Sequence, residues 1–206
     1  MIIVISIIIQ PCHNYFVMGF QKYGDSSKKI EVKDKQIEIC CAWGDKLKDG
    51  ILTYKIVNAT SESEKLVTTA LNDWQQNIKG LIFKKAASDE DVDILVTFRD
   101  DYGKVAGQTV TNFQNGFIFN TKILLAEKAY TKKLDDDIIE YIAKHEIGHA
   151  LGLGHANFDK SLMSSLVYNS YNNITQCEID ALIEANKWKF IENSLPKISK
   201  IKKYEC

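Results

Sequence analysis

Hydrophobic and polar positions follow two rhythms along this chain, and each rhythm predicts one kind of element. Short apolar runs that are rich in β-branched and aromatic residues predict strands at residues 51–57 and 93–98. The second run is uninterrupted, which is typical of a central strand buried on both faces. Residues 104–110 and 116–123 flank the turn signal Asn115-Gly116 and predict a β-hairpin.

Three other segments carry apolar residues at intervals of three and four, which predicts helices. The first opens with the capping-box pair Ser61 and Glu64. The second spans residues 134–152, and the third opens at Thr175. The order of strands and helices indicates an α+β domain whose two parts meet near residues 152–155.

The beginning of the chain differs in composition from the rest. Its first twenty residues include 14 apolar ones and no lysine, arginine, aspartate or glutamate. We predict a leader of residues 1–28 with a secretory signal peptide, hence a secreted protein, and the alternative is a membrane anchor within residues 1–20. Neither makes the segment part of the fold. Residues 29–206 are expected to form a single domain, with an upper part at about 36–152 and a lower part at about 153–206.

The overall composition narrows the class of protein. Of 206 residues, 45% are hydrophobic and 26% are charged, and the net charge is -1. This is typical of a soluble globular protein. The near-neutral charge gives no reason to expect nucleic acid as a partner, and we expect a monomer without a transmembrane helix in its mature form. A solvated tail is predicted for four lysines near the end: Lys197, Lys200, Lys202 and Lys203.

The cysteines allow disulfides but do not determine them. If Cys12 leaves with the leader, four of the five cysteines remain, and they can form two disulfides in three ways. Cys40 and Cys41 are adjacent and are not expected to bridge each other. The alternative is that all four are free thiols.

The densest chemistry lies at residues 145–155, HEIGHALGLGH, which hold three of the four histidines. Four residues make just over one helical turn, so His145 and His149 lie on one face, about 6 Å apart along the axis. Two imidazoles in this arrangement can bind one Zn²⁺. Glu146 lies about 100° around the helix, where it can act as a general base toward a metal-bound water.

A third ligand has to come from beyond the helix. Gly152 can adopt the left-handed conformation that ends the helix, and Gly154 is expected to let the backbone pass close to the metal. His155 then completes three protein ligands and leaves a fourth position open, as in catalytic zinc sites. A purely structural zinc site would not explain Glu146.

With this extended motif, and with Met163 eight residues after His155, the chain resembles the metzincin metalloproteases, in particular the matrixin-like group. Softer matches extend the resemblance from about residue 43 to 190. It implies a zincin/metzincin-like α+β fold: a twisted mixed β-sheet, an active-site helix and a smaller C-terminal subdomain. It also implies that Met163 forms an apolar floor beneath the histidines and is not a ligand.

The resemblance further implies a zinc-dependent endopeptidase with one catalytic Zn²⁺ that acts on protein or peptide substrates, with Glu146 as general base. The substrate would lie extended along an edge strand that includes Gly107, Gln108 and Thr109. The alternative is a non-catalytic zinc-binding module that recognises a partner, and the intact Glu146 argues against it.

Three features of the family are not matched. Cys12 lies in QPCHN, which differs from the pro-segment motif that caps the zinc, so latency through Cys12 is not expected. The loop for a structural zinc and calcium is missing; Asp100 and Asp101 could hold Ca²⁺, but a polar turn is the simpler interpretation. Ser165 stands where some metzincins have a zinc-contacting tyrosine, and Tyr168 is displaced from that position.

Overall fold

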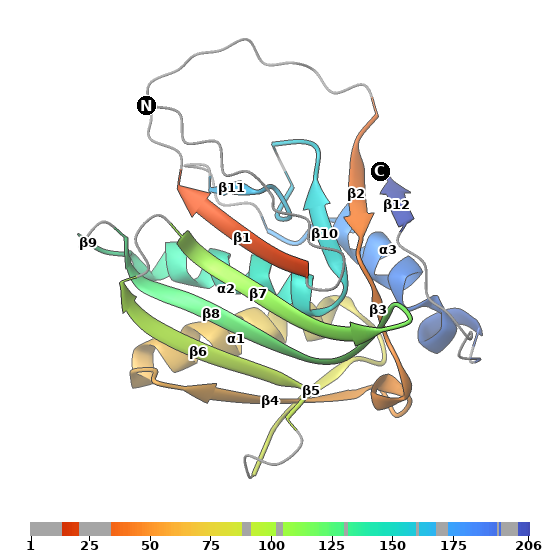
Figure 1. Ribbon diagram of the computed structural model, residues 1–206, viewed down its shortest axis with the longest axis horizontal. Coiled ribbons are helices and arrows are strands. Elements are labelled where there is room, and N and C mark those ends of the chain that lie inside the picture. Colours follow the sequence, from red (N-terminus) through yellow and green to blue (C-terminus); the bar gives the residue numbers. More distant parts are fainter. Residues whose placement is uncertain are drawn as a thin grey trace.

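The computed structural model contains a large mixed sheet with two helices behind it and a smaller three-stranded sheet beside them (Figure 1). It describes residues 14–20, 34–87, 92–101, 105–129, 132–159, 161–167, 173–192, 194 and 202–206. The large sheet has the order β11-β1-β7-β8-β6-β4-β5, and β3 and β9 also pair with β8. Its strands are β1 (Asn14–Phe20), β3 (Ala42–Trp43), β4 (Ile51–Val57), β5 (Ile82–Lys85), β6 (Ile94–Asp101), β7 (Val105–Gln114), β8 (Phe117–Ala129), β9 (Lys132–Lys133) and β11 (Leu166–Val167).

The small sheet joins distant parts of the chain in the order β10-β2-β12. Its strands are β2 (Gln36–Ile39), β10 (Leu153–Ala156) and β12 (Lys202–Glu205). Lys202 and Lys203, predicted in a solvated tail, therefore belong to a strand that pairs with β2. The helices are α1 (Ser61–Asn77), α2 (Asp136–Ala150) and α3 (Gln176–Ala185), with the short helices η1 (Asp45–Leu47) and η2 (Trp188–Glu192).

The predicted secondary structure is largely confirmed. β4 covers the predicted strand, and β6 lies between β8 and β4 inside the sheet. The hairpin of β7 and β8 turns at Asn115 (φ 55°) and Gly116 (φ 81°), the positive φ values that an Asn-Gly turn requires. The cap of α1 differs from the prediction: Thr60, not Ser61, is the N-cap, and its hydroxyl accepts a hydrogen bond from the Ser63 N–H at 3.1 Å.

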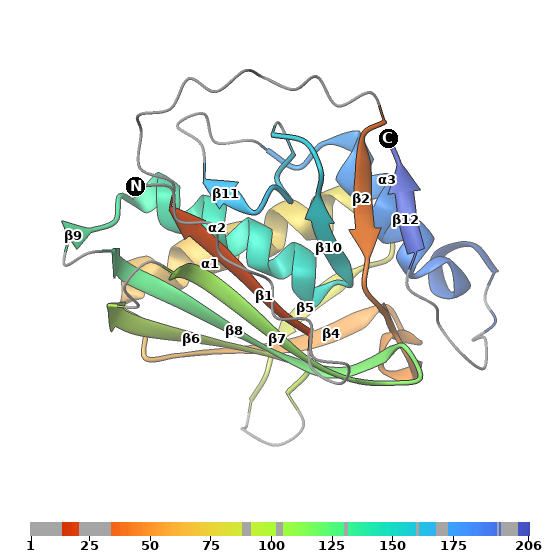
Figure 2. The ribbon, with the colours of Figure 1, turned by 45° about the horizontal axis from the view of Figure 1, so that its top comes forward.

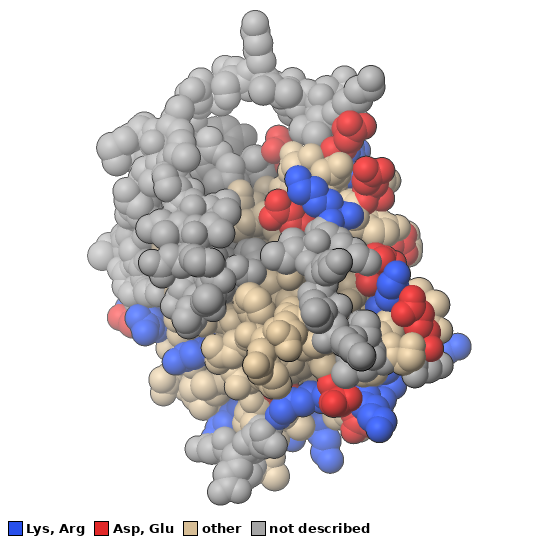
Figure 3. Space-filling model, turned by 45° about the vertical axis from the view of Figure 1, so that its right-hand side comes forward, with Lys and Arg blue, Asp and Glu red and all other residues tan. Residues whose placement is uncertain are grey.

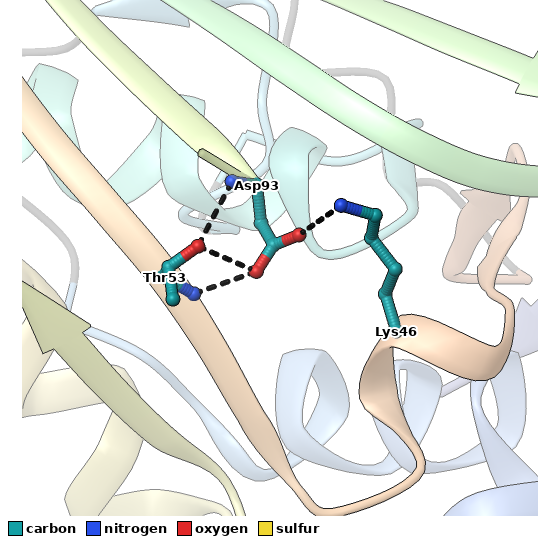
Figure 4. A network of polar contacts seen from close by, with 3 residues as sticks. All are labelled: Lys46, Thr53 and Asp93. Atoms are coloured by element: carbon teal, nitrogen blue, oxygen red, sulfur yellow. Dashed lines mark hydrogen bonds and ion pairs between the residues drawn. The ribbon is translucent and has the colours of Figure 1, made fainter. Parts of the chain in front are cut away.

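Helices α1 and α2 pack against each other and bury the apolar face of α1. Trp74 is fully buried, and its indole N–H donates to the carbonyl of Lys144 in α2 at 2.9 Å. At one end of the sheet, the buried Asp93 carboxylate accepts hydrogen bonds from the backbone N–H and the hydroxyl of Thr53 at 2.7 and 2.8 Å, and it pairs with Lys46 (Figure 4). These contacts join β4 to the start of β6.

The first strand corrects the expectation that residues 1–28 lie outside the fold. Residues 14–20 form β1, which pairs antiparallel with β7 and parallel with β11 (Figure 2). Without β1, the side of β7 that faces away from β8 would be an unpaired sheet edge, and such an edge readily takes up another strand. The segment is uncharged and contains three aromatic residues and a valine, types that favour strands, which suits it to that position.

The cysteine pairing also differs from expectation. The structure joins Cys40 to Cys41 and Cys177 to Cys206. Between β2 and β3, the N–H groups of Cys40 and Cys41 both donate to the carbonyl of Gly152, at 2.9 and 3.4 Å. The bond between these adjacent cysteines is the pairing that the sequence did not lead us to expect. The second disulfide links the first turn of α3 to the residue after β12.

The surface charge and the length of the helices bear on whether nucleic acid or a membrane could be a partner. Lysine and arginine side chains lie interspersed with aspartates and glutamates on the face shown in Figure 3. None of the helices in the described part of the chain is long and apolar enough to cross a membrane.

Candidate metal centre

Helix α2 carries the first half of the zinc motif and ends where the sequence predicts. Its last carbonyl groups are satisfied from other elements: the Trp43 indole N–H donates to Ala150 at 3.0 Å, and the Asn186 amide donates to Leu151 at 3.1 Å. Gly152 follows with φ 105°, and a Cβ atom there would lie 2.3 Å from the carbonyl oxygen of Cys41. Only glycine therefore fits the turn that redirects the chain into β10.

The turn brings the three predicted histidines together. His145 and His149 project from α2 and are fully buried, and His155 approaches from β10. The Nε2 atoms of His145 and His149 lie 2.9 Å apart, and one ring nitrogen from each of the three residues lies within 4.8 Å of the others. One helix thus supplies two converging nitrogens, and the bend at Gly152 delivers the third.

Backbone carbonyls fix the two helical histidines in the form that binds metal. The Nδ1 of His145 lies 2.7 Å from the Leu162 oxygen, and that of His149 lies 2.8 Å from the Leu153 oxygen. Because a carbonyl can only accept, each Nδ1 carries the proton and each Nε2 keeps its lone pair for a ligand. Three imidazoles of this kind form a donor set that fits Zn²⁺.

Burial keeps these imidazoles neutral. It lowers the pKa of His145 to about 3 and that of His155 to about 4, and it lowers the pKa of His149 well below its usual value. Ring nitrogens that remain unprotonated near neutral pH are available to a cation.

Glu146 lies next to this cluster and is fully buried. Its Oε2 accepts a hydrogen bond from the Thr109 hydroxyl at 2.7 Å, whereas Oε1 is buried without a hydrogen-bond partner among the described residues. Burial raises the pKa of this carboxyl to about 8, and the Thr109 hydrogen bond acts in the opposite direction. One oxygen is held in place and the other is left for chemistry.

Met163 packs directly on helix α2. It is fully buried, and a Cβ atom on Gly148 would lie 2.5 Å from its sulfur. Its carbonyl accepts from the Ala156 N–H at 2.9 Å, which links the methionine to the strand that carries His155.

Sequence reasoning missed the part played by Glu178. Its carboxylate is fully buried and accepts hydrogen bonds from the Ser161 hydroxyl at 2.5 Å and the Leu162 N–H at 3.0 Å, as well as from Thr175. The carbonyl of Leu162 in turn holds His145. The capping-box spacing from Thr175 to Glu178 predicted the start of α3 correctly, but it gave no sign that the same carboxylate supports the metal centre.

The three residues predicted to bind substrate, Gly107, Gln108 and Thr109, lie on β7 and face alternate sides of the strand. Thr109 is fully buried and faces Glu146, and a Cβ atom on Gly107 would lie 2.5 Å from Oε1 of Glu146. Gln108, between them, points to the other face of the strand and is half-buried. The backbone of this stretch pairs with β1, so the predicted edge strand is covered.

Other residues considered in the sequence analysis either have a contact that was not expected or lie outside the described part of the chain. At Gly154, a Cβ atom would lie 2.7 Å from Cβ of Glu38, so the packing of β10 against β2 requires the glycine. Asp100, a possible calcium ligand, pairs with Lys128 at 2.6 Å. Cys12 and Tyr168 lie outside the described residues, and of Asp101 only the backbone is described.

The metzincin class of zinc metalloproteases is defined by a helix with two histidines and a glutamate, a glycine turn to a third histidine, and a methionine that follows them, here packed against the helix. The Matrixin family model matches residues 42–183, and the chain belongs to the matrixin family.

The chain is also similar to a curated protein and to a solved structure. The archaemetzincin of Saccharolobus solfataricus is 27% identical over 175 residues, which cover 78% of this chain and 87% of that protein. The solved structure of myroilysin superposes with a TM-score of 0.47 at 12% identity and covers 71% of this chain and 97% of that one.

Proposed function

We propose that this matrixin is a zinc-dependent endopeptidase in which Glu146 is the general base. The observation that carries the proposal is the placement of Glu146, with Oε2 fixed by Thr109 and Oε1 left without a hydrogen-bond partner among the described residues, beside three converging histidines. A module that only bound zinc would have no use for a buried carboxylate at this point, because burying it without a partner for each oxygen is unfavourable.

The residues divide the chemistry between them. His145, His149 and His155 would hold Zn²⁺. When bound, the metal supplies a Lewis acid that polarises the scissile carbonyl and lowers the pKa of a water molecule. Oε1 of Glu146 accepts the proton of the attacking water and returns it to the departing amine, so the carboxylate ends the cycle unchanged.

Glu146 has to be ionised to act as a base. In the structure its pKa is about 8, mainly because the group is buried. When the site opens to water and substrate, part of this burial is removed and the pKa moves back toward its usual range. The Thr109 hydrogen bond favours the ionised form throughout, because it is donated to the carboxylate.

The substrate is proposed to lie along β7 as an extended strand. β7 continues on both sides of the two residues nearest Glu146, Gly107 and Thr109, so a polypeptide could run past the catalytic centre instead of ending there. This arrangement favours cleavage within a chain over removal of terminal residues. Backbone pairing would supply affinity with little dependence on sequence.

The test is casein digestion by the purified full chain loaded with zinc, with and without a chelator, beside the variant Glu146→Gln. We expect cleavage that the chelator abolishes and that Glu146→Gln lowers by at least about a hundredfold, a typical contribution of a general base. The variant His155→Ala should lose zinc, measured by metal analysis of the dialysed protein. A protein that binds one zinc but cleaves nothing, even when β1 is detached from β7, would be a binding module.

A further inference from the structure

The strand position between β7 and β11 is occupied by a segment of the same chain. β1 pairs antiparallel with β7 from Asn14 opposite Thr111 to Met18 opposite Gly107. It then pairs parallel with β11, with Gly19 opposite Leu166. Figures 1 and 2 both show β1 running beside β7, with α2 behind it.

The register places β1 directly over the catalytic residues. Phe16 lies opposite Thr109, whose hydroxyl binds Glu146, and Met18 lies opposite Gly107, whose Cα is packed against the same carboxylate. With β1 in this position, His145, Glu146 and His149 have no exposed surface. A protein substrate cannot pair with β7 while β1 does, because both would need the same backbone groups.

We propose that the position between β7 and β11 receives an extended peptide and that residues 14–20 are its resident occupant, so the chain is latent until β1 leaves. The proposal rests on the proposed endopeptidase function and adds its regulation. The latency involves strand pairing over Glu146 and requires no contact between a cysteine and the metal.

The register also explains how such an occupant escapes cleavage. Between Met18 and Gly19 the pairing shifts, so that Gly19 lies opposite Val105 and not Ala106. At this irregularity the strand leaves the regular β7 ladder and passes to β11, beside the residue packed on Glu146. A peptide bond at a bulge is displaced from the position that a regularly paired substrate would give it.

The connection to the rest of the chain makes β1 an effective competitor. Fifteen residues of sequence separate β1 from β2, so β1 competes as an intramolecular ligand, with an effective concentration on the order of 1 mM. Suppose that the affinity of β1 for β7 matches that of a substrate with a KM of about 0.1 mM. Then β1 is paired with β7 in about nine-tenths of the molecules. Release of β1 should therefore raise kcat/KM about tenfold.

The main test compares the zinc-loaded full chain with the double variant Val17→Pro/Met18→Pro. Adjacent residues of a strand direct their N–H groups to opposite edges, so the two prolines remove one donor toward β7 and one away from it. The control is Ser26→Pro/Ser27→Pro, which adds two prolines outside β1. Casein cleavage should rise about tenfold in the first variant and stay unchanged in the control.

A second variant keeps β1 intact and guards against a folding defect. A recognition site for a specific protease is inserted between Ser26 and Ser27, and cutting there makes β1 free to dissociate. Activity should rise after cutting, and a synthetic peptide of residues 13–21 should restore competitive inhibition where a scrambled peptide does not. Hydrogen exchange should show faster exchange of the β7 amides that face β1 after release, while those that face β8 stay protected.

The outcomes separate this proposal from the proposed function. Equal, chelator-sensitive activity in the wild type and both released forms overturns latency and leaves the endopeptidase function intact. β7 amides that exchange equally in all forms overturn the seating of β1. If release exposes β7 and still no form cleaves casein, the endopeptidase function fails and the latency of that activity fails with it.

Discussion

The metal centre and the strand position over it are built in opposite ways. The metal centre comes from one stretch, His145 to Met163, in which two helical turns, a glycine and a short strand place every ligand. The strand position comes from β1, β7 and β11, which are far apart in the sequence and meet only by backbone pairing. The first depends on side chains at fixed spacings, whereas the second accepts any segment that can extend.

The same difference distinguishes the rigidly held histidines from β1, the segment that is proposed to move. The histidines are held by carbonyls at 2.7 and 2.8 Å, and the loop that holds His145 is tied to the buried Glu178. β1 is joined to β7 by six residue pairs and to β11 by two, near the margin of the sheet, where pairings open at a lower free energy than core elements do. The same neighbourhood can therefore keep a rigid metal site under a removable cover.

The largest expected effect comes from breaking the turn that makes the metal centre continuous. Gly152→Ala adds a Cβ atom 2.3 Å from the Cys41 carbonyl at φ 105°, and we expect it to lower the free energy of unfolding by about 2–5 kcal/mol and to release zinc. Gly80→Ala is the matched control: its φ is 90°, but nothing lies within 4 Å, so only the backbone strain of about 1–2 kcal/mol remains. Urea unfolding and metal analysis of both variants measure the difference, and equal losses would show that the contact at Cys41 does not matter.

An intermediate effect is expected from the support of the metal centre. Glu178→Gln replaces one acceptor oxygen by an amide that faces donors, and it should cost about 2–3 kcal/mol and weaken zinc binding about tenfold. Glu184→Gln in the same helix is the control, because its carboxylate forms a surface ion pair with Lys187 at 3.3 Å and its loss should change stability by less than about 0.5 kcal/mol. Thermal unfolding and competition with a zinc chelator give the two quantities. Unchanged zinc affinity in Glu178→Gln would confine its role to α3.

The smallest expected effect concerns Thr109, the residue that joins the metal centre to the strand position over it. Thr109→Val keeps the shape but removes the hydroxyl that donates to Glu146, and in the released Val17→Pro/Met18→Pro background kcat should fall about tenfold. Thr109→Ser should recover most of this loss. KM and zinc content should not change, because the side chain faces α2 and not the substrate. A raised KM at unchanged kcat would instead assign Thr109 to substrate binding.

The sequence by itself determined the parts that depend on local periodicity. The spacing of His145 and His149 follows from 3.6 residues per turn, Gly152 from the need for a positive φ, and the hairpin turn from Asn115-Gly116. These features have to be encoded within a few neighbouring residues, because the backbone conformation is decided there. That is why the clustering of the three histidines, the turn at Gly152 and the β7–β8 hairpin could be predicted.

Only the tertiary structure decided which distant groups meet. A carboxylate that caps a helix looks the same in sequence whether or not it also reaches the loop behind His145, so the second role of Glu178 could not be predicted. Cys40 and Cys41 both donate to the carbonyl of Gly152, which is distant in sequence, and the turn of Thr109 toward Glu146 depends on how α2 packs on β7. β1 pairs through backbone groups that every residue carries, so a pattern of side chains can show that residues 14–20 suit a strand but not which edge they cover.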